Sequence, residues 1–202
     1  MVRFGSEGNE KPGLIDEQGN LCDLSSYLDD ISGPNLSENK LLEISKIDTI
    51  NLPKIDKSTR LGPCVNNVGK FICIGLNYAD HAKEAGMVVP PEQVIFMKAT
   101  SAICGPADPI LLPRGSLKTD WEVELAVVIG KKAKYVNLDE AMSYVAGYAA
   151  SNEVTTATTT KKVTTVRTKE TLEKCLTRRL SPRRRKNEAE VGPLDMKGYI
   201  II

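Results

Sequence analysis

Two glutamates, Glu122 and Glu124, lie within the apolar run from Asp120 to Gly130, where acidic side chains need an explanation. The β-branched residues and the closing glycine predict a strand that is buried over its second half. Because side chains alternate along a strand, both carboxylates point to one face. At the edge of a core they repel each other and lose hydration, unless a cation or proton neutralises them. A bound divalent ion and a half-exposed edge strand whose acids face water both remain open.

A third acid, Glu153, lies near the end of another predicted strand, residues 145–154. If the two strands are neighbours, the three carboxylates form an oxygen site for Mg²⁺ or Mn²⁺, hard cations that keep positions open for water and substrate. Zinc would favour histidine or cysteine ligands instead. Taken alone, Glu153 fits a solvated acid at a strand end better than a metal ligand.

The histidine of this chain, His81, follows a predicted strand that ends in Gly75. Residues 79–85 predict a short helix, on which His81 and Glu84 are three positions apart and within reach of each other. A carboxylate that holds one imidazole proton raises the basicity of the other nitrogen, as a general base near neutral pH requires. A surface histidine beside a surface glutamate on an ordinary amphipathic turn is the alternative.

Composition places the chain among globular proteins and names no partner. The 202 residues are 41% hydrophobic and 26% charged, with a formal net charge of +1. The N-terminus is polar and no apolar run approaches a membrane span, so we expect a cytoplasmic protein with no membrane partner. Five cysteines without a Cys-x-x-Cys pair argue against a disulfide framework and a thiolate zinc site.

The charge is divided unevenly along the chain. Acids outnumber bases up to residue 154, and Lys and Arg predominate after it. We predict three segments: a small N-terminal α+β domain at 1–65, a catalytic core at 66–154 and a basic tail at 155–202. The predicted elements are a hairpin at 12–21 that turns at 18–20, helices at 24–31, 39–47 and 137–144, and strands at 69–75, 94–98, 120–130 and 145–154.

Four segments, in order and with suitable spacing, resemble the fumarylacetoacetate hydrolase family. Two further segments, Lys11–Leu14 and Arg60–Pro63, resemble the extra N-terminal domain of its ureidoglycolate lyase-like and diketo-deoxy-sugar hydrolase-like branch. The resemblance implies an α+β fold with a mixed β-roll core. The four core segments are Gly75–His81, Phe96–Ser101, Asp120–Gly130 and Gly147–Val154.

The resemblance also implies a function and its residues. Glu122 and Glu124 match two metal ligands, and Glu153 stands where the family usually has an aspartate. His81 and Glu84 match the catalytic pair. The implied activity is that of a hydrolase or lyase that cleaves a 2-oxo acid or 1,3-dicarbonyl compound through a metal-stabilised enolate. The resemblance also implies a homodimer. Decarboxylation and isomerisation pass through the same enolate, so these residues do not separate the four reactions.

We expect the resemblance to end at residue 154. In the family, the region that follows holds further core strands and a lysine in a Lys-x-x-Asp-Thr-like stretch, and neither is evident after residue 154. The sequence therefore predicts an altered or truncated C-terminus and an incomplete core with open sheet edges. Two alternatives follow: an inactive relative that still binds metal, and a protein whose basic tail binds nucleic acid.

Overall fold

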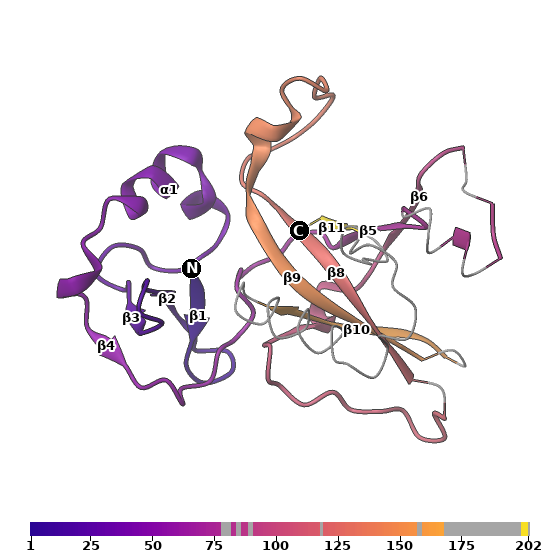
Figure 1. The fold of residues 1–202 in the computed structure, drawn as a ribbon, viewed down its shortest axis with the longest axis horizontal. Coiled ribbons are helices and arrows are strands. Elements are labelled where there is room, and N and C mark those ends of the chain that lie inside the picture. Colours follow the sequence, from indigo (N-terminus) through magenta and orange to yellow (C-terminus); the bar gives the residue numbers. More distant parts are fainter. Residues whose placement is uncertain are drawn as a thin grey trace, which may run out of the picture.

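The computed structural model describes residues 1–77, 82–83, 86–88, 91–117, 119–156, 159–167 and 199–201. Two β-sheets form its framework, a small one from the first 55 residues and a larger one from the rest (Figure 1). His81, Glu84, Cys175 and the arginine clusters at 178–179 and 183–185 lie outside the described residues. In the part of the chain that is described, no helix is long and apolar enough to cross a membrane.

The small sheet has four antiparallel strands in the order β1-β2-β3-β4. The predicted hairpin is confirmed as β2 and β3, and its turn is held by the Asp16 carboxylate, which accepts hydrogen bonds from the backbone N–H groups of Gln18 and Asn20. Gly19 has a φ of +74°, which explains a glycine in this turn. The strands are β1 (Val2–Phe4), β2 (Lys11–Ile15), β3 (Leu21–Asp23) and β4 (Lys54–Ile55).

One of the two N-terminal helices is confirmed and the other prediction is wrong. Helix α1 spans Glu38–Ser45 and so overlaps most of the predicted 39–47 region, and it is flanked by the 3-10 helices η1 (Gly33–Leu36) and η2 (Thr49–Asn51). Residues 24–31 form turns instead of a helix. Their apolar spacing serves burial alone, because Leu24, Leu28 and Ile31 all lie in the core while the Asp30 carboxylate binds the Arg3 guanidinium.

The larger sheet has seven strands in the order β6-β5-β11-β8-β9-β10-β7. β11 runs parallel to β8, β10 runs parallel to β7, and the other neighbours are antiparallel, so the sheet is mixed. All four predicted core strands are confirmed, and the predicted helix at 137–144 is reduced to the 3-10 helix η4 (Ala141–Tyr144). The strands are β5 (Ile72–Gly75), β6 (Val94–Met97), β7 (Ile103–Cys104), β8 (Thr119–Ile129), β9 (Val145–Thr156), β10 (Thr159–Arg167) and β11 (Tyr199–Ile201).

The expectation that no core strands follow residue 154 is wrong. β10 and β11 both lie beyond that point and both pair within the large sheet. β10 is rich in threonine and valine, whose branched side chains favour a pleated surface, and the Tyr-Ile-Ile sequence of β11 has the same preference. The sequence did not predict these two strands because they lie in or beyond a strongly basic segment, which was interpreted as a tail.

The large sheet curls, because its two edge strands are joined by a very short connection. β6 ends at Met97 on one edge, and β7 begins six positions later at Ile103 on the other edge, through the 3-10 helix η3 (Thr100–Ala102). That connection spans at most about 20 Å, whereas a flat sheet of seven strands is about 29 Å wide. Among the described residues the two edges are not paired with each other, so the sheet is a curled open one.

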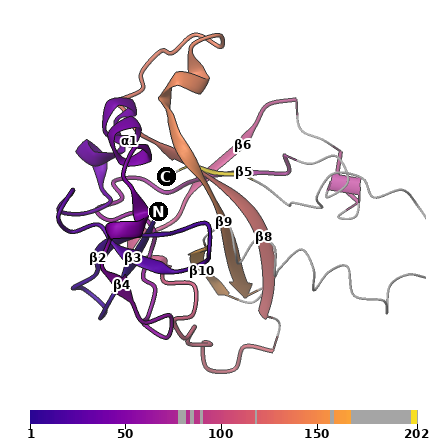
Figure 2. The same cartoon turned by 60° about the vertical axis from the view of Figure 1, so that its left-hand side comes forward.

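The N-terminal unit shares its core with the β8–β9 hairpin. Val128 of β8 belongs to the same buried cluster as Leu24, Leu28 and Ile31, and Ala146 packs against that cluster. Figures 1 and 2 show this unit, in indigo and purple, to one side of the long β8 and β9 ribbons. The unit therefore supports one end of the strand pair that carries the predicted metal ligands.

Candidate metal centre

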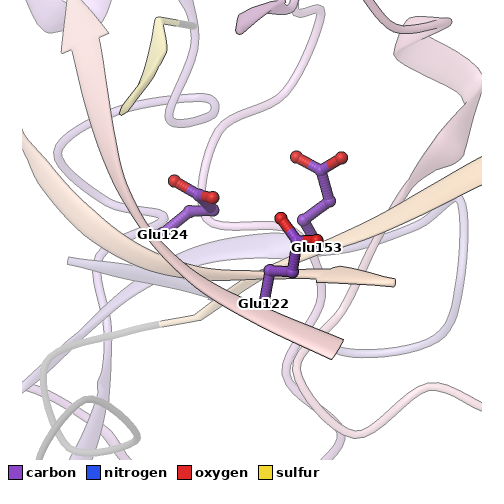
Figure 3. Close-up of side chains that lie close together, drawn as sticks. All are labelled: Glu122, Glu124 and Glu153. Carbon is purple, nitrogen blue, oxygen red and sulfur yellow. The ribbon is translucent and has the colours of Figure 1, made fainter. Parts of the chain in front are cut away.

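The three predicted metal ligands lie together on one face of β8 and β9. In the antiparallel ladder Glu122 stands opposite Glu153, and Glu124 stands opposite Ser151. Directly opposite residues share a face, with Cβ atoms about 5 Å apart. Figure 3 shows the three carboxylates on the same side of the two ribbons. The sequence predicted this common face for Glu122 and Glu124, and the ladder register adds Glu153.

The carboxylates are close enough to share one cation. One oxygen from each of Glu122, Glu124 and Glu153 lies within 4.8 Å of the others. Glu124 and Glu153 are each 3% exposed, and Glu122 is partly buried. A cation at the centre of such a triangle is within reach of all three oxygens at ordinary Mg²⁺ or Mn²⁺ distances after small side-chain movements. The half-exposed edge strand considered for Glu122 and Glu124 does not describe this arrangement.

Sequence reasoning missed Lys98, which contacts this cluster. The Lys98 ammonium forms an ion pair with the Oε1 atom of Glu153, and the two side chains are 3% and 4% exposed. Lys98 directly follows β6, and its backbone N–H donates to the Phe71 carbonyl at 3.0 Å, which fixes where the side chain begins. The available signal was a single charge at the end of an apolar strand. Only the curl of the sheet brings that charge to β9.

The donor set fits a divalent cation. All three ligands are carboxylate oxygens, which hard cations prefer. The three carboxylates carry three negative charges when ionised, and the Lys98 ammonium leaves two for a divalent ion to neutralise. One step further along the same face, Ala126 stands opposite Ala149, and both belong to a buried apolar cluster with Phe71 and Cys73. Because these apolar residues lower the local dielectric constant, they strengthen charge interactions in the neighbouring carboxylate cluster.

The predicted catalytic pair, His81 and Glu84, lies outside the described residues, so its position relative to the carboxylates stays a prediction. The chain resumes with helical Ala82 and Lys83, and Ala82 is buried.

Comparison with known sequences identifies the family. The sequence model for the fumarylacetoacetate (FAA) hydrolase C-terminal domain matches residues 70–183, more than half of the chain. This span extends past residue 154, where we expected the resemblance to end. A Burkholderia orbicola (strain MC0-3) protein with a provisional hydrolase name is 54% identical over 154 residues, which cover 76% of this chain and 55% of that protein. The chain thus spans about half the length of the curated relatives it matches.

Solved structures share the fold. A fumarylacetoacetate hydrolase from Exiguobacterium antarcticum is 31% identical with a TM-score of 0.58, over 77% of this chain and 55% of that one. A 5-carboxymethyl-2-hydroxymuconate delta-isomerase from Mycobacterium smegmatis is 28% identical with a TM-score of 0.53, over 77% and 54%. A maleylpyruvate hydrolase from Sphingobium sp. SYK-6, solved with manganese(II) and pyruvate, is 21% identical with a TM-score of 0.65, over 82% and 65%.

The curled mixed sheet, the matched span of residues 70–183 and the structural neighbours agree with one another. The chain belongs to the fumarylacetoacetate hydrolase family.

Proposed function

We propose that this protein is a divalent-metal-dependent hydrolase or lyase that acts on a small 2-oxo acid or 1,3-dicarbonyl compound. The observation that carries the proposal is the buried convergence of Glu122, Glu124 and Glu153, with oxygens within 4.8 Å of one another, beside the ammonium of Lys98. Family membership supports it, because the relatives include enzymes named as hydrolases and isomerases.

The three glutamates would hold Mg²⁺ or Mn²⁺. When bound, the cation would draw electron density from the 2-oxo group of a substrate and so favour formation of an enolate. Lys98 limits the negative charge of the cluster, which reduces its repulsion of an anionic substrate. Glu153 has a longer arm than the aspartate usual in the family, and its contact with Lys98 is consistent with that extra length.

His81 would act as the general base, oriented by Glu84. In a hydrolytic reaction the imidazole would take a proton from water. The hydroxide oxygen would then bond to the carbon of the substrate's second carbonyl group, not to that of the 2-oxo group. The carbon–carbon bond then breaks with its electron pair on the 2-oxo fragment, which regains the proton. In this scheme the carboxylate of Glu84 stabilises the imidazolium between the two proton transfers. The homodimer and the cytoplasmic location stay predictions.

Calorimetric titration of the purified 202-residue chain with Mn²⁺ and Mg²⁺ tests the cluster. We expect one binding site, which is lost in the Glu122→Ala/Glu124→Ala variant. The matched control is Glu92→Ala/Glu140→Ala, which removes two exposed glutamates that do not belong to the cluster and should bind as the original chain does. A folded protein that binds neither cation contradicts the proposal.

Turnover separates an enzyme from an inactive relative. Acylpyruvates and oxaloacetate are suitable substrates because both combine a 2-oxo acid with a second carbonyl group. We expect metal-dependent turnover that Glu122→Ala/Glu124→Ala and His81→Ala both abolish, with metal affinity retained in His81→Ala. Metal binding without turnover of any such compound would identify a metal-binding relative without this activity.

A further inference from the structure

Ser151 is a buried polar residue on the carboxylate face that the proposed function has not used. It is 2% exposed, and among the described residues its hydroxyl oxygen has no hydrogen-bond partner. It stands directly opposite Glu124 in the ladder, and Glu153 is two positions further along the same strand. Its Cβ therefore projects from the same face as the three carboxylates.

Packing does not account for a serine at this position. The two residues before it on β9 are the buried Ala149 and Ala150, so a methyl side chain is large enough to fill the neighbouring buried positions. A buried hydroxyl without a partner destabilises a fold, and alanine in its place would remove that penalty. An unpaired hydroxyl of this kind indicates a partner that joins the site from outside the chain.

The chemistry of the cluster indicates what that partner is. Its three carboxylates accept hydrogen bonds when ionised and donate none. An oxygen atom of water or of an anionic substrate that enters the cluster needs donors, and a hydroxyl supplies one without adding charge. The Lys98 ammonium contacts Glu153, whereas Ser151 stands opposite Glu124. The two donors therefore lie next to different carboxylates of the cluster.

We infer that Ser151 is a positioning residue of the metal centre, whose hydroxyl donates a hydrogen bond to an oxygen atom of water or of a 2-oxo acid held at the carboxylates. This inference rests on the proposed function, since it needs the glutamates to hold a cation.

Thermal unfolding and calorimetry of Ser151→Ala test the inference without an activity assay. In the metal-free protein we expect the variant to melt at the same temperature as the original chain or higher, because it loses an unpaired hydroxyl. With Mn²⁺, and then with Mn²⁺ plus pyruvate, we expect about 2- to 10-fold weaker binding in one of the two titrations. Pyruvate is chosen because the maleylpyruvate hydrolase structure of this fold holds it together with manganese.

The titrations distinguish the source of the oxygen. A weaker affinity for Mn²⁺ alone indicates water, whereas an unchanged Mn²⁺ affinity with weaker pyruvate binding indicates the substrate. Ser151→Thr, which keeps a hydroxyl, should recover much of the lost affinity. Ser143→Ala removes an exposed hydroxyl that Lys131 contacts at 3.1 Å and should change neither titration.

Equal affinities of Ser151→Ala and the original chain in both titrations overturn the inference and leave the proposed function standing. A lower melting temperature of metal-free Ser151→Ala, with no change in either affinity, makes the residue a structural one. If the original chain binds no Mn²⁺, the proposed function fails and this inference fails with it.

Discussion

The charge of single residues determines what the carboxylate cluster can hold. Glu124 and Glu153 are almost inaccessible to water, and the Lys98 ammonium is buried with them. Loss of one partner of a buried ion pair leaves an uncompensated charge in a low-dielectric site, which is more damaging than replacement of both partners. Lys98 therefore supports the fold as well as the charge of the site.

Lys98→Met should lower the unfolding free energy by about 3 kcal/mol, because the Glu153 carboxylate loses the ammonium that it contacts. Urea unfolding monitored by circular dichroism measures the change. The double variant Lys98→Met/Glu153→Gln should be more stable than Lys98→Met alone, since it removes both charges. The control is Lys131→Met, which replaces an exposed lysine over the Tyr144 ring and should cost at most about 1 kcal/mol. Equal effects of the two single substitutions would contradict this view of Lys98.

Much of the site is readable from the sequence, since Glu122 and Glu124 share a face by alternation alone. Glu153 needed one further condition, that its strand be a neighbour of the first, and the register opposite Glu122 meets it. Lys98 and Ser151 could not be found in this way. Lys98 reaches the cluster through the curl of the sheet. Alternation along β9 places Ser151 on the face of Glu153, but only the structure shows that its buried hydroxyl lacks a hydrogen-bond partner among the described residues.

At the level of elements, long strands were easier to predict than short helices. β8 and β9 have runs of β-branched and small residues long enough to fix their type; the structure shifts β8 by one residue from the predicted 120–130 and extends β9 by two beyond residue 154. Residues 24–31 had helical spacing because three buried apolar residues meet one core, although the chain between them turns. The sequence did not predict β10 and β11, although their residues favour strands, because strongly basic residues surround them. Some of their pairing partners are also distant in sequence.

Gly130 directly follows β8, at the contact between the hairpin and the N-terminal unit. A Cβ atom at this position would collide with the backbone carbonyl of Leu36 and would lie 2.8 Å from the Cβ of Ala146. The close approach of the two backbones therefore requires a residue without a side chain.

Gly130→Ala should destabilise the protein by about 1–3 kcal/mol, because the Leu36 carbonyl cannot move without shifting η1. The melting temperature in differential scanning calorimetry measures this effect. Gly147→Ala is the matched control on the partner strand, where no atom lies within 4 Å of the added methyl group, and we expect it to be neutral within about 0.5 kcal/mol. Equal melting temperatures of the two variants would show that the Leu36 carbonyl does not restrict the side chain at position 130.

In the whole molecule, a chain of ion pairs links the N-terminal unit to the segment after β7. Arg60 binds Asp108 through two bonds of 2.7 Å and binds Glu10 at 2.8 Å. Arg3 connects the same Glu10 to Asp30. The Arg60 guanidinium, together with the Gly105 backbone N–H, holds the pKa of the Asp108 carboxyl below its ordinary value. The predicted boundary at residue 65 is thus crossed by charged contacts as well as by the shared core.

Asp108→Asn should reduce stability at pH 7 by about 1.5–3 kcal/mol, since two charge-assisted hydrogen bonds weaken. A carboxyl whose pKa is lowered by folding stabilises the protein fully above its ordinary pKa of about 4, and this stabilisation is lost as the pH falls through the lower pKa of the folded state. The difference between variant and original chain should therefore begin to shrink below about pH 5, roughly one unit above the ordinary pKa, and continue to shrink as the pH falls toward the lower pKa of the folded state.

Urea unfolding at several pH values measures this difference. The exposed Asp139 provides the control, and Asp139→Asn should give a stability curve parallel to that of the original chain. A difference for Asp108→Asn that stays constant down to pH 3 would show that the charge of Asp108 does not contribute to the link.

The place of β11 in the large sheet has a consequence for how the protein forms during synthesis. β11 lies between β5 and β8, yet it follows all the other strands of the sheet in sequence. On the ribosome, β5, β6, β8, β9 and β10 therefore all emerge before β11, and the position between β5 and β8 in the sheet is filled only when residues 199–201 emerge. The long sequence separation makes this closing step slow. Until it occurs, the facing edges of β5 and β8 are open to pairing with strands of other chains.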